Sequence, residues 1–214
     1  MNDKKIWTAQ ERRLLDRLNT PWEIQKFLNR TPYNPESECR SPRYVIQNKR
    51  ANCSEGAIFA AAALQYHGYL PFIMDLQAQK GKDDDHVIAV FPKNCLLGSI
   101  AKSNFTVLRF RDAIYSNPKE VALAYFDFYF NREGEKTLHK YSTLMDIEDK
   151  FSETNWQTSR DEVDFITEEL DRTPHFSLIS ALIKRNLSPV DPDLLEAGLL
   201  GSNPAGLYKP KKKN

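Results

Sequence analysis

A cysteine and a histidine, each next to an apolar stretch, are the residues of this sequence best suited to chemistry. Cys53 lies within residues 51–57 (ANCSEGA), where a polar segment gives way to alanine and large apolar side chains that continue to Tyr66. His86 heads a second apolar run, residues 87–91 (VIAVF). An imidazole within hydrogen-bond reach of a thiol can accept its proton and later return it to a leaving group. The pair therefore predicts a cysteine nucleophile, Cys53, with His86 as its base.

The predicted position of Cys53 favours a reactive thiol. Residues 54–66 have the composition of a helix, and Gly68 stands where a helix C-terminus is commonly followed by glycine. Because this helix is apolar around most of its circumference, we expect it to lie at the centre of the fold. Unpaired N–H groups and the helix dipole stabilise negative charge at its start, which favours the thiolate of Cys53. The alternative is an inert buried cysteine, the more common case.

The elements before Cys53 are predicted to be a helical hairpin and a loop. Thr8 and Thr20 are each followed three residues later by a glutamate, a pattern typical of helix N-termini. These signals predict two short helices within residues 1–30. Residues 31–52 contain three prolines and many polar side chains, so we expect them to be mainly loop. A loop of this length is more often functional than decorative.

The elements after the central helix predict a sheet followed by further helices. Short connections separate expected strands over residues 69–76, 87–91, 95–100 and 106–110. The remainder is expected to be mostly helical, with helices starting at Pro118 and lying near residues 144–151, 161–170, 176–184 and 191–200. This order predicts the α+β class, with an antiparallel β-sheet packed on one central helix and additional N- and C-terminal helices. We expect one domain over residues 1–208, made of the hairpin (1–30), a catalytic-type core (45–110) and a helical C-terminal part (118–200), followed by a basic disordered tail (209–214).

Composition excludes several classes of function. The 214 residues are 41% hydrophobic and 28% charged with a net charge of +1, which gives no electrostatic case for binding nucleic acid or a membrane surface. No apolar run reaches the roughly 18 residues that a transmembrane helix needs, and no signal peptide is recognisable. Three cysteines without an export signal argue against a disulfide framework, and no metal-ligand spacing occurs. We therefore expect a cytoplasmic protein without metal or cofactor.

The order of these residues resembles the core of the transglutaminase-like superfamily. The resemblance lies in residues 52–57, 64–71 and 85–90, and it extends over residues 45–110, about a third of the chain. Members have a cysteine at the start of a helix and a histidine that heads a later strand. The resemblance implies a papain-like core, a Cys–His–Asp triad and acyl transfer on a peptide, protein or small amide substrate. It implies Cys53 as nucleophile and His86 as base.

The sequence departs from the superfamily pattern at the third member of the triad. Residues 95–110, where the aspartate is expected, contain no acidic side chain. Ser99, Ser103 and Asn104 are the alternatives, and the asparagine that orients the histidine of papain-like proteases favours Asn104 by analogy. Gln47 lies six positions before Cys53, as does the glutamine that donates to the oxyanion in those proteases. Gln47 is equally consistent with a solvated loop residue.

Three functions fit the sequence. The first is a cysteine hydrolase or acyltransferase that works through a thioester, resolved by water or by an amine. The second is a binding module on the same fold, whose missing acid marks lost catalysis and whose cleft holds a peptide or protein. The third is an unrelated structural α+β domain. Selective reaction of Cys53 with a thiol reagent separates the first from the second.

Overall fold

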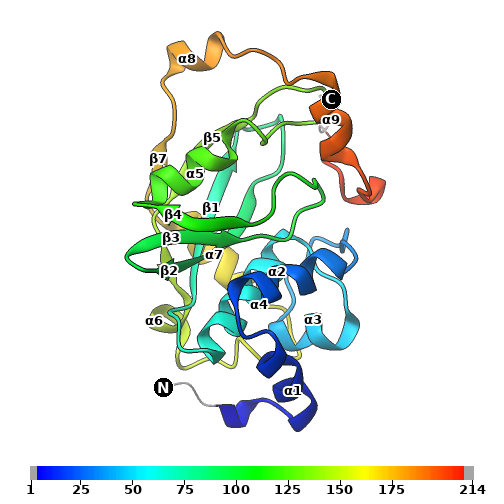
Figure 1. Cartoon of the computed structure of the whole chain (residues 1–214), viewed down its shortest axis with the longest axis vertical. Helices are drawn as coiled ribbons and strands as arrows, with labels where there is room; N and C mark the ends of the chain where they lie inside the picture. Colours follow the sequence, from blue (N-terminus) through cyan, green and yellow to red (C-terminus); the bar gives the residue numbers. More distant parts are fainter. Residues whose placement is uncertain (1–3, 210–214) are drawn as a thin grey trace.

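The structure of the chain is a computed structural model, which describes residues 4–209 (Figure 1). Its helices are η1 (Lys4–Ile6), α1 (Ala9–Arg17), α2 (Pro21–Arg30), α3 (Pro42–Asn48), α4 (Cys53–Tyr66), α5 (Pro118–Phe126), α6 (Ile147–Phe151), α7 (Asp164–Arg172), α8 (Ala181–Arg185), α9 (Pro192–Leu199) and η2 (Pro204–Gly206). Its strands are β1 (Phe72–Ala78), β2 (His86–Lys93), β3 (Leu96–Ile100), β4 (Arg111–Tyr115), β5 (Leu138–Ser142), β6 (Met145–Asp146) and β7 (His175–Ser177).

The strands form one sheet, in the order β4-β3-β2-β1-β5-β7, and β6 pairs with the start of β1. Neighbouring strands in this order are antiparallel throughout. The α+β class and the antiparallel sheet are therefore confirmed. No helix within residues 4–209 is both long and apolar enough to cross a membrane.

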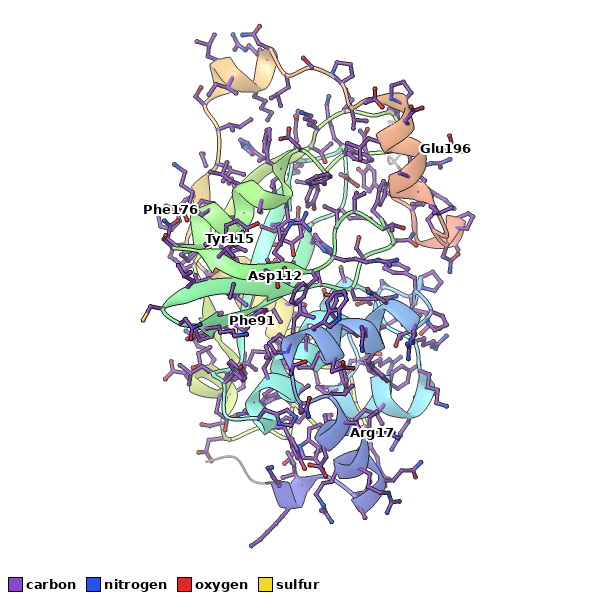
Figure 2. All side chains as sticks on the ribbon, viewed as in Figure 1. Arg17, Phe91, Asp112, Tyr115, Phe176 and Glu196 are labelled. Carbon is purple, nitrogen blue, oxygen red and sulfur yellow. The ribbon has the colours of Figure 1, made fainter. Side chains whose placement is uncertain are left out.

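Helix α4 is the centre of the larger of two apolar clusters. Residues 55–64 of this helix are all buried, as their composition predicts. Strand β2 separates the clusters, because its side chains alternate between the two faces of the sheet. Val87, Ala89 and Phe91 pack with α4, whereas Ile88 and Val90 pack with α5 on the other face. Figure 1 shows α2, α3 and α4 together on one side of the sheet, and Figure 2 shows Phe91 between the sheet and these helices.

The N-terminus of α4 is fixed by a capping box around the candidate nucleophile. The Asn52 side chain accepts a hydrogen bond from the Glu55 N–H, and the Glu55 carboxylate accepts one from the Asn52 N–H. The same carboxylate, which is fully buried, also accepts from Asn34 Nδ2 and from the Arg40 N–H. Glu55 therefore fastens the preceding segment to the helix that carries Cys53.

Several predicted elements differ from the structure. Residues 31–52 contain α3, where Ser41 caps the helix and Pro42 takes its first position, so this proline starts a helix instead of breaking one. The strand expected over residues 106–110 is wrong, since the next strand is β4 at residues 111–115. The helix expected over residues 176–184 is present only in its second half, as α8 (181–185), because β7 takes residues 175–177.

The segment 118–200 is less helical than expected. It contributes β5 and β7, which extend the sheet beyond β1. Their sequences are polar and short, so they lack the apolar alternation that predicts a strand. Long-range pairing with β1 overrides the weak local preference. Of the expected basic tail (209–214), residues 210–214 lie outside the described part of the chain, and Lys209 is exposed.

Candidate functional site

A pocket of about 820 Å³ opens where the start of α4 meets the start of β2. Both candidate catalytic residues line it, Cys53 from the helix and His86 from the strand. The connection between β1 and β2 supplies Asp83, Asp84 and Asp85, and the end of the described chain, residues 205–209, supplies a further part of the wall. The sequence therefore brings the two predicted residues to one cavity, although they are distant along the chain.

Cys53 is half-buried at the first position of α4. Its sulfur lies 4.0 Å from the Asp85 carbonyl oxygen and 3.9 Å from the Ser54 hydroxyl. Burial raises the pKa of the Cys53 thiol, and hydrogen bonds from the Val87 backbone and from Ser54 only partly oppose that rise. The thiol is therefore protonated at neutral pH despite its place at a helix N-terminus, and it needs a base to become a nucleophile.

His86 is almost fully buried, with 5% of its surface exposed. Its ring meets the Tyr129 ring edge-on, with the centroids 6.3 Å apart. Burial lowers the pKa of His86 to about 4; a hydrogen bond with the Leu108 backbone opposes this shift, and the Arg111 charge adds to it. Nε2 is buried and has no hydrogen bond of standard geometry within residues 4–209. His86 is therefore a neutral imidazole with one ring nitrogen unpaired.

The two side chains approach the pocket from different sides of the sheet. Alternation places His86 on the face of Ile88 and Val90, and its contact with Tyr129 agrees with that placement. Helix α4 packs against the opposite face. The Cys53 sulfur meets the carbonyl of Asp85, the residue just before the start of β2, and no hydrogen bond joins it to His86 in the described chain. The residues share a cavity without forming a pair in this resting arrangement.

Asn104, the favoured third member of a triad, lines the pocket but has other partners. Its Nδ2 donates to the Asn203 carbonyl at 2.9 Å, and its Oδ1 accepts from the Asn203 N–H at 2.7 Å. An orienting role toward His86 would require Asn104 to release Asn203. The polar group that does act on the His86 ring is the Leu108 backbone.

The two serine alternatives are also engaged elsewhere. The Ser99 hydroxyl is 2.8 Å from the hydroxyl of Tyr125, and the Ser103 hydroxyl accepts from the Phe105 N–H. Ser99 is fully buried in β3 and does not line the pocket. Within residues 4–209, none of the three alternatives is hydrogen-bonded to His86.

Gln47, the predicted oxyanion donor, is exposed on α3 and does not line the pocket. The backbone of Cys53 hydrogen-bonds instead to Tyr33, whose pKa is raised by burial and by the nearby Cys53, Asp84 and Glu55. Tyr33 stands twenty positions before Cys53 in a segment predicted as loop, and nothing in its surroundings marks it as part of a site. It is the pocket residue that sequence reasoning missed most clearly.

The three aspartates of the pocket, Asp83, Asp84 and Asp85, all have raised pKa values. Burial is the main cause that raises the pKa of Asp83 to about 7 and that of Asp85 to about 6. Hydrogen bonds from Thr137 and from the Asp84 N–H to Asp83, and from the Ala78 N–H to Asp85, only partly offset it. The negative charges of Asp83 and Asp85 therefore develop near pH 7 and pH 6 respectively.

Asp83→Asn is expected to stabilise the protein at pH 8. In the folded state Asp83 keeps its proton up to about pH 7, whereas in the unfolded chain it loses the proton near the ordinary pKa of 3.8. The free energy of unfolding therefore decreases as the pH rises from 3.8 to about 7. A neutral side chain of the same shape avoids that loss. We expect a gain of about 1 kcal/mol, or 2–4 °C in Tm, at pH 8 and none near pH 4.

Thermal unfolding followed by circular dichroism at both pH values measures this effect. Asp161→Asn, at an exposed position away from the pocket, is the matched control and should shift Tm by less than about 1 °C at either pH. Equal Tm values for Asp83→Asn and the parent at pH 8 would contradict a raised pKa of Asp83 in the folded state.

Comparison of the sequence with protein-family models and with curated proteins gave no match. The transglutaminase-like resemblance therefore stays a prediction that rests on residues 45–110 alone.

Proposed function

We propose that this protein is a cysteine-dependent amide or peptide hydrolase, or an acyltransferase, of transglutaminase-like type. One observation carries the proposal. A half-buried thiol at the start of a buried helix opens into a large pocket that also holds a buried, neutral imidazole with an unpaired ring nitrogen. A buried polar atom without a partner is costly, and such atoms gather at functional sites.

The proposed reaction has two stages. In the first, Cys53 Sγ attacks the carbonyl carbon of the amide while His86 accepts the thiol proton. The C–N bond then breaks, the amine leaves with that proton, and a thioester remains on Cys53. In the second, His86 accepts a proton from water or from an acceptor amine, which attacks the thioester. The S–C bond breaks, and the proton returns to the cysteine sulfur.

The pKa values of the two groups favour proton transfer during attack over a resting ion pair. A raised thiol pKa and a His86 pKa of about 4 both disfavour thiolate and imidazolium before substrate arrives. Two groups can donate a hydrogen bond to the developing oxyanion. One is the Cys53 N–H, once the Tyr33 hydroxyl moves away from it, and the other is the Tyr33 hydroxyl itself.

Acylation by p-nitrophenyl acetate tests this proposal. Mass spectrometry of the intact protein and of its peptides should find one acetyl group on Cys53 after brief reaction at pH 7. Cys95 is the internal control, because it is an exposed free thiol outside the pocket. Acetylation of Cys95 at a rate equal to or above that of Cys53 would contradict the proposal.

The alternative, a catalytically inactive peptide- or protein-binding module on the same fold, has its own supporting observation. Asn104 binds the backbone of Asn203, and residues 205–209 line the cavity, so the site already holds a peptide segment against its wall. A protein of this kind would bind peptide but leave Cys53 unacetylated. The acetylation experiment therefore separates the two functions.

A further inference from the structure

The last described segment, Asn203–Lys209, forms part of the wall of the candidate pocket. Its residues 205–209 line the same cavity as Cys53 and His86. Residues 204–206 form η2, which Asn203 caps through a hydrogen bond from the Ala205 N–H. Figure 1 shows α9 and the described segment that follows it at the upper right of the molecule, away from η1 and α1. The pocket wall is therefore built partly from a terminal segment that follows the last α-helix.

The anchor of this segment is recognition of its backbone. Asn104 both donates to the carbonyl and accepts from the N–H of Asn203, as a neighbouring β-strand would. The Asn203 side chain adds a longer bond, 3.4 Å, to the Tyr33 carbonyl. Because Asn104 reads main-chain atoms that every residue except proline presents, the same contact is open to other peptides.

Gly206 lies against Tyr33 so closely that no side chain fits between them. A Cβ at this position would stand 2.5 Å from Tyr33 Cε1 and 3.3 Å from Asn104 Nδ2. Tyr33 also contacts the backbone of Cys53. The segment therefore packs against Tyr33, whose hydroxyl contacts the backbone of Cys53. If the segment left the wall, Tyr33 could move and leave the Cys53 N–H accessible.

The rest of the wall favours a positive charge. Glu36, Asp83, Asp84 and Asp85 line the pocket, against Lys80 and Lys209 as the lining cations in the described chain. The mutual repulsion of neighbouring aspartates contributes to the raised pKa of Asp83 and Asp85, and a bound cation would relieve it. His86 Nε2 adds an unpaired buried polar atom to the same cavity.

We propose that this pocket binds peptide segments that carry a lysine or arginine, and that Asn203–Lys209, which forms part of its wall, is an internal competitor that an external peptide displaces. The proposal names the substrate class of the site and in that sense rests on the proposed function, but peptide binding itself does not need the Cys53 thiol. An attached segment competes at an effective concentration in the millimolar range, so it masks the site from peptides of similar affinity.

Binding of a fluorescent peptide with the sequence of residues 201–209 (GSNPAGLYK), followed by anisotropy, tests the proposal. Two full-length proteins are compared, the parent and Gly206→Ala, in which the added methyl group keeps the internal segment from seating. We expect the variant to bind at least about tenfold more tightly, because the competitor is removed. Ala197→Ser, a substitution at an exposed position of α9 outside the pocket, is the matched control and should bind like the parent.

Two further measurements test the recognition of the cation and of the backbone separately. A peptide with glutamine in place of the final lysine should bind Gly206→Ala about fivefold or more weakly if the acidic wall recognises the cation. Asn203→Pro removes the N–H that Asn104 accepts, so it should open the site as Gly206→Ala does. Equal affinity of the parent and both variants, or no binding to any of them, overturns the proposal.

The same titrations with Cys53→Ser separate this inference from the catalytic one. If Cys53→Ser still binds the peptide and the parent protein is not acetylated, the peptide site is supported and the proposed catalytic function is rejected. If Cys53 is acetylated but no peptide binds, the catalytic function is supported and the peptide site is rejected.

Discussion

His86→Ala is expected to slow acetylation of Cys53 by p-nitrophenyl acetate about 100-fold or more at pH 7. The raised pKa of the thiol leaves little thiolate at this pH, so the reaction depends on a base that removes the proton during attack. Stopped-flow release of p-nitrophenol gives the rate. His139→Ala is the matched control, because His139 lies on β5 outside the pocket, and its rate should equal that of the parent.

The pH dependence of the same reaction follows from the His86 pKa. Because burial lowers that pKa to about 4, the imidazole stays neutral and able to accept a proton down to about pH 5. The parent rate should therefore change little between pH 7 and pH 5, whereas an unburied histidine base would lose activity near its ordinary value of 6.5. In His86→Ala the rate should instead rise about tenfold per pH unit below the thiol pKa. Acetylation of His86→Ala at the parental rate, with the parental pH profile, would remove His86 from the mechanism.

Glu55→Ala is expected to cost at least about 3 kcal/mol of folding free energy. The carboxylate is fully buried and accepts hydrogen bonds from Asn52, Asn34 and Arg40, so its removal leaves three donors without a partner. Each such buried group costs about 1–3 kcal/mol, against a total stability of about 5–15 kcal/mol for a domain. The first turn of α4 also loses its capping box, and the Cys53 sulfur loses its fixed position.

Urea unfolding followed by tryptophan fluorescence measures this loss. Glu36→Ala is the matched control, since Glu36 pairs with Arg50 at the surface, where both side chains are about 40% exposed, and it should cost less than about 1 kcal/mol. Glu55→Gln keeps the side-chain length but offers one acceptor oxygen, so its loss should be intermediate. A midpoint of Glu55→Ala within error of the Glu36→Ala value would show that the buried network is not what fixes α4.

The elements that sequence reasoning predicted well are those with strong local signals. Helix α4 has an apolar composition and a capping box, and β1, β2 and β3 are β-branched or apolar runs joined by short turns. Strand β4 is half-exposed along its length, and β7 has three residues, so neither carries a periodic pattern. These edge strands exist because the sheet offers them partners, which is a tertiary effect that no local window contains.

The same distinction applies to the site. Cys53 and His86 were predicted as one site from residue type and placement, and the structure puts both on one pocket. The contacts of Tyr33 and of Asn203 were not predictable, because they join separate segments of the chain through only one or two hydrogen bonds. Asn104 was chosen by analogy, and its actual partner lies 99 residues away. Burial of Cys53, which raises its pKa against the helix dipole, also required the fold.

The bonds of Glu55 also suggest an order of events in folding. The bond from Asn52 spans three residues, so it forms as soon as the first turn of α4 does. The bonds from Arg40 and Asn34 close loops of 15 and 21 residues, and the entropic cost of closure delays them. We therefore expect hydrogen-exchange protection to develop in α4 before it develops at the backbone amide of Arg40. Pulse-labelling during refolding would reveal that sequence, and simultaneous protection of both would show that the segment and the helix fold as one unit.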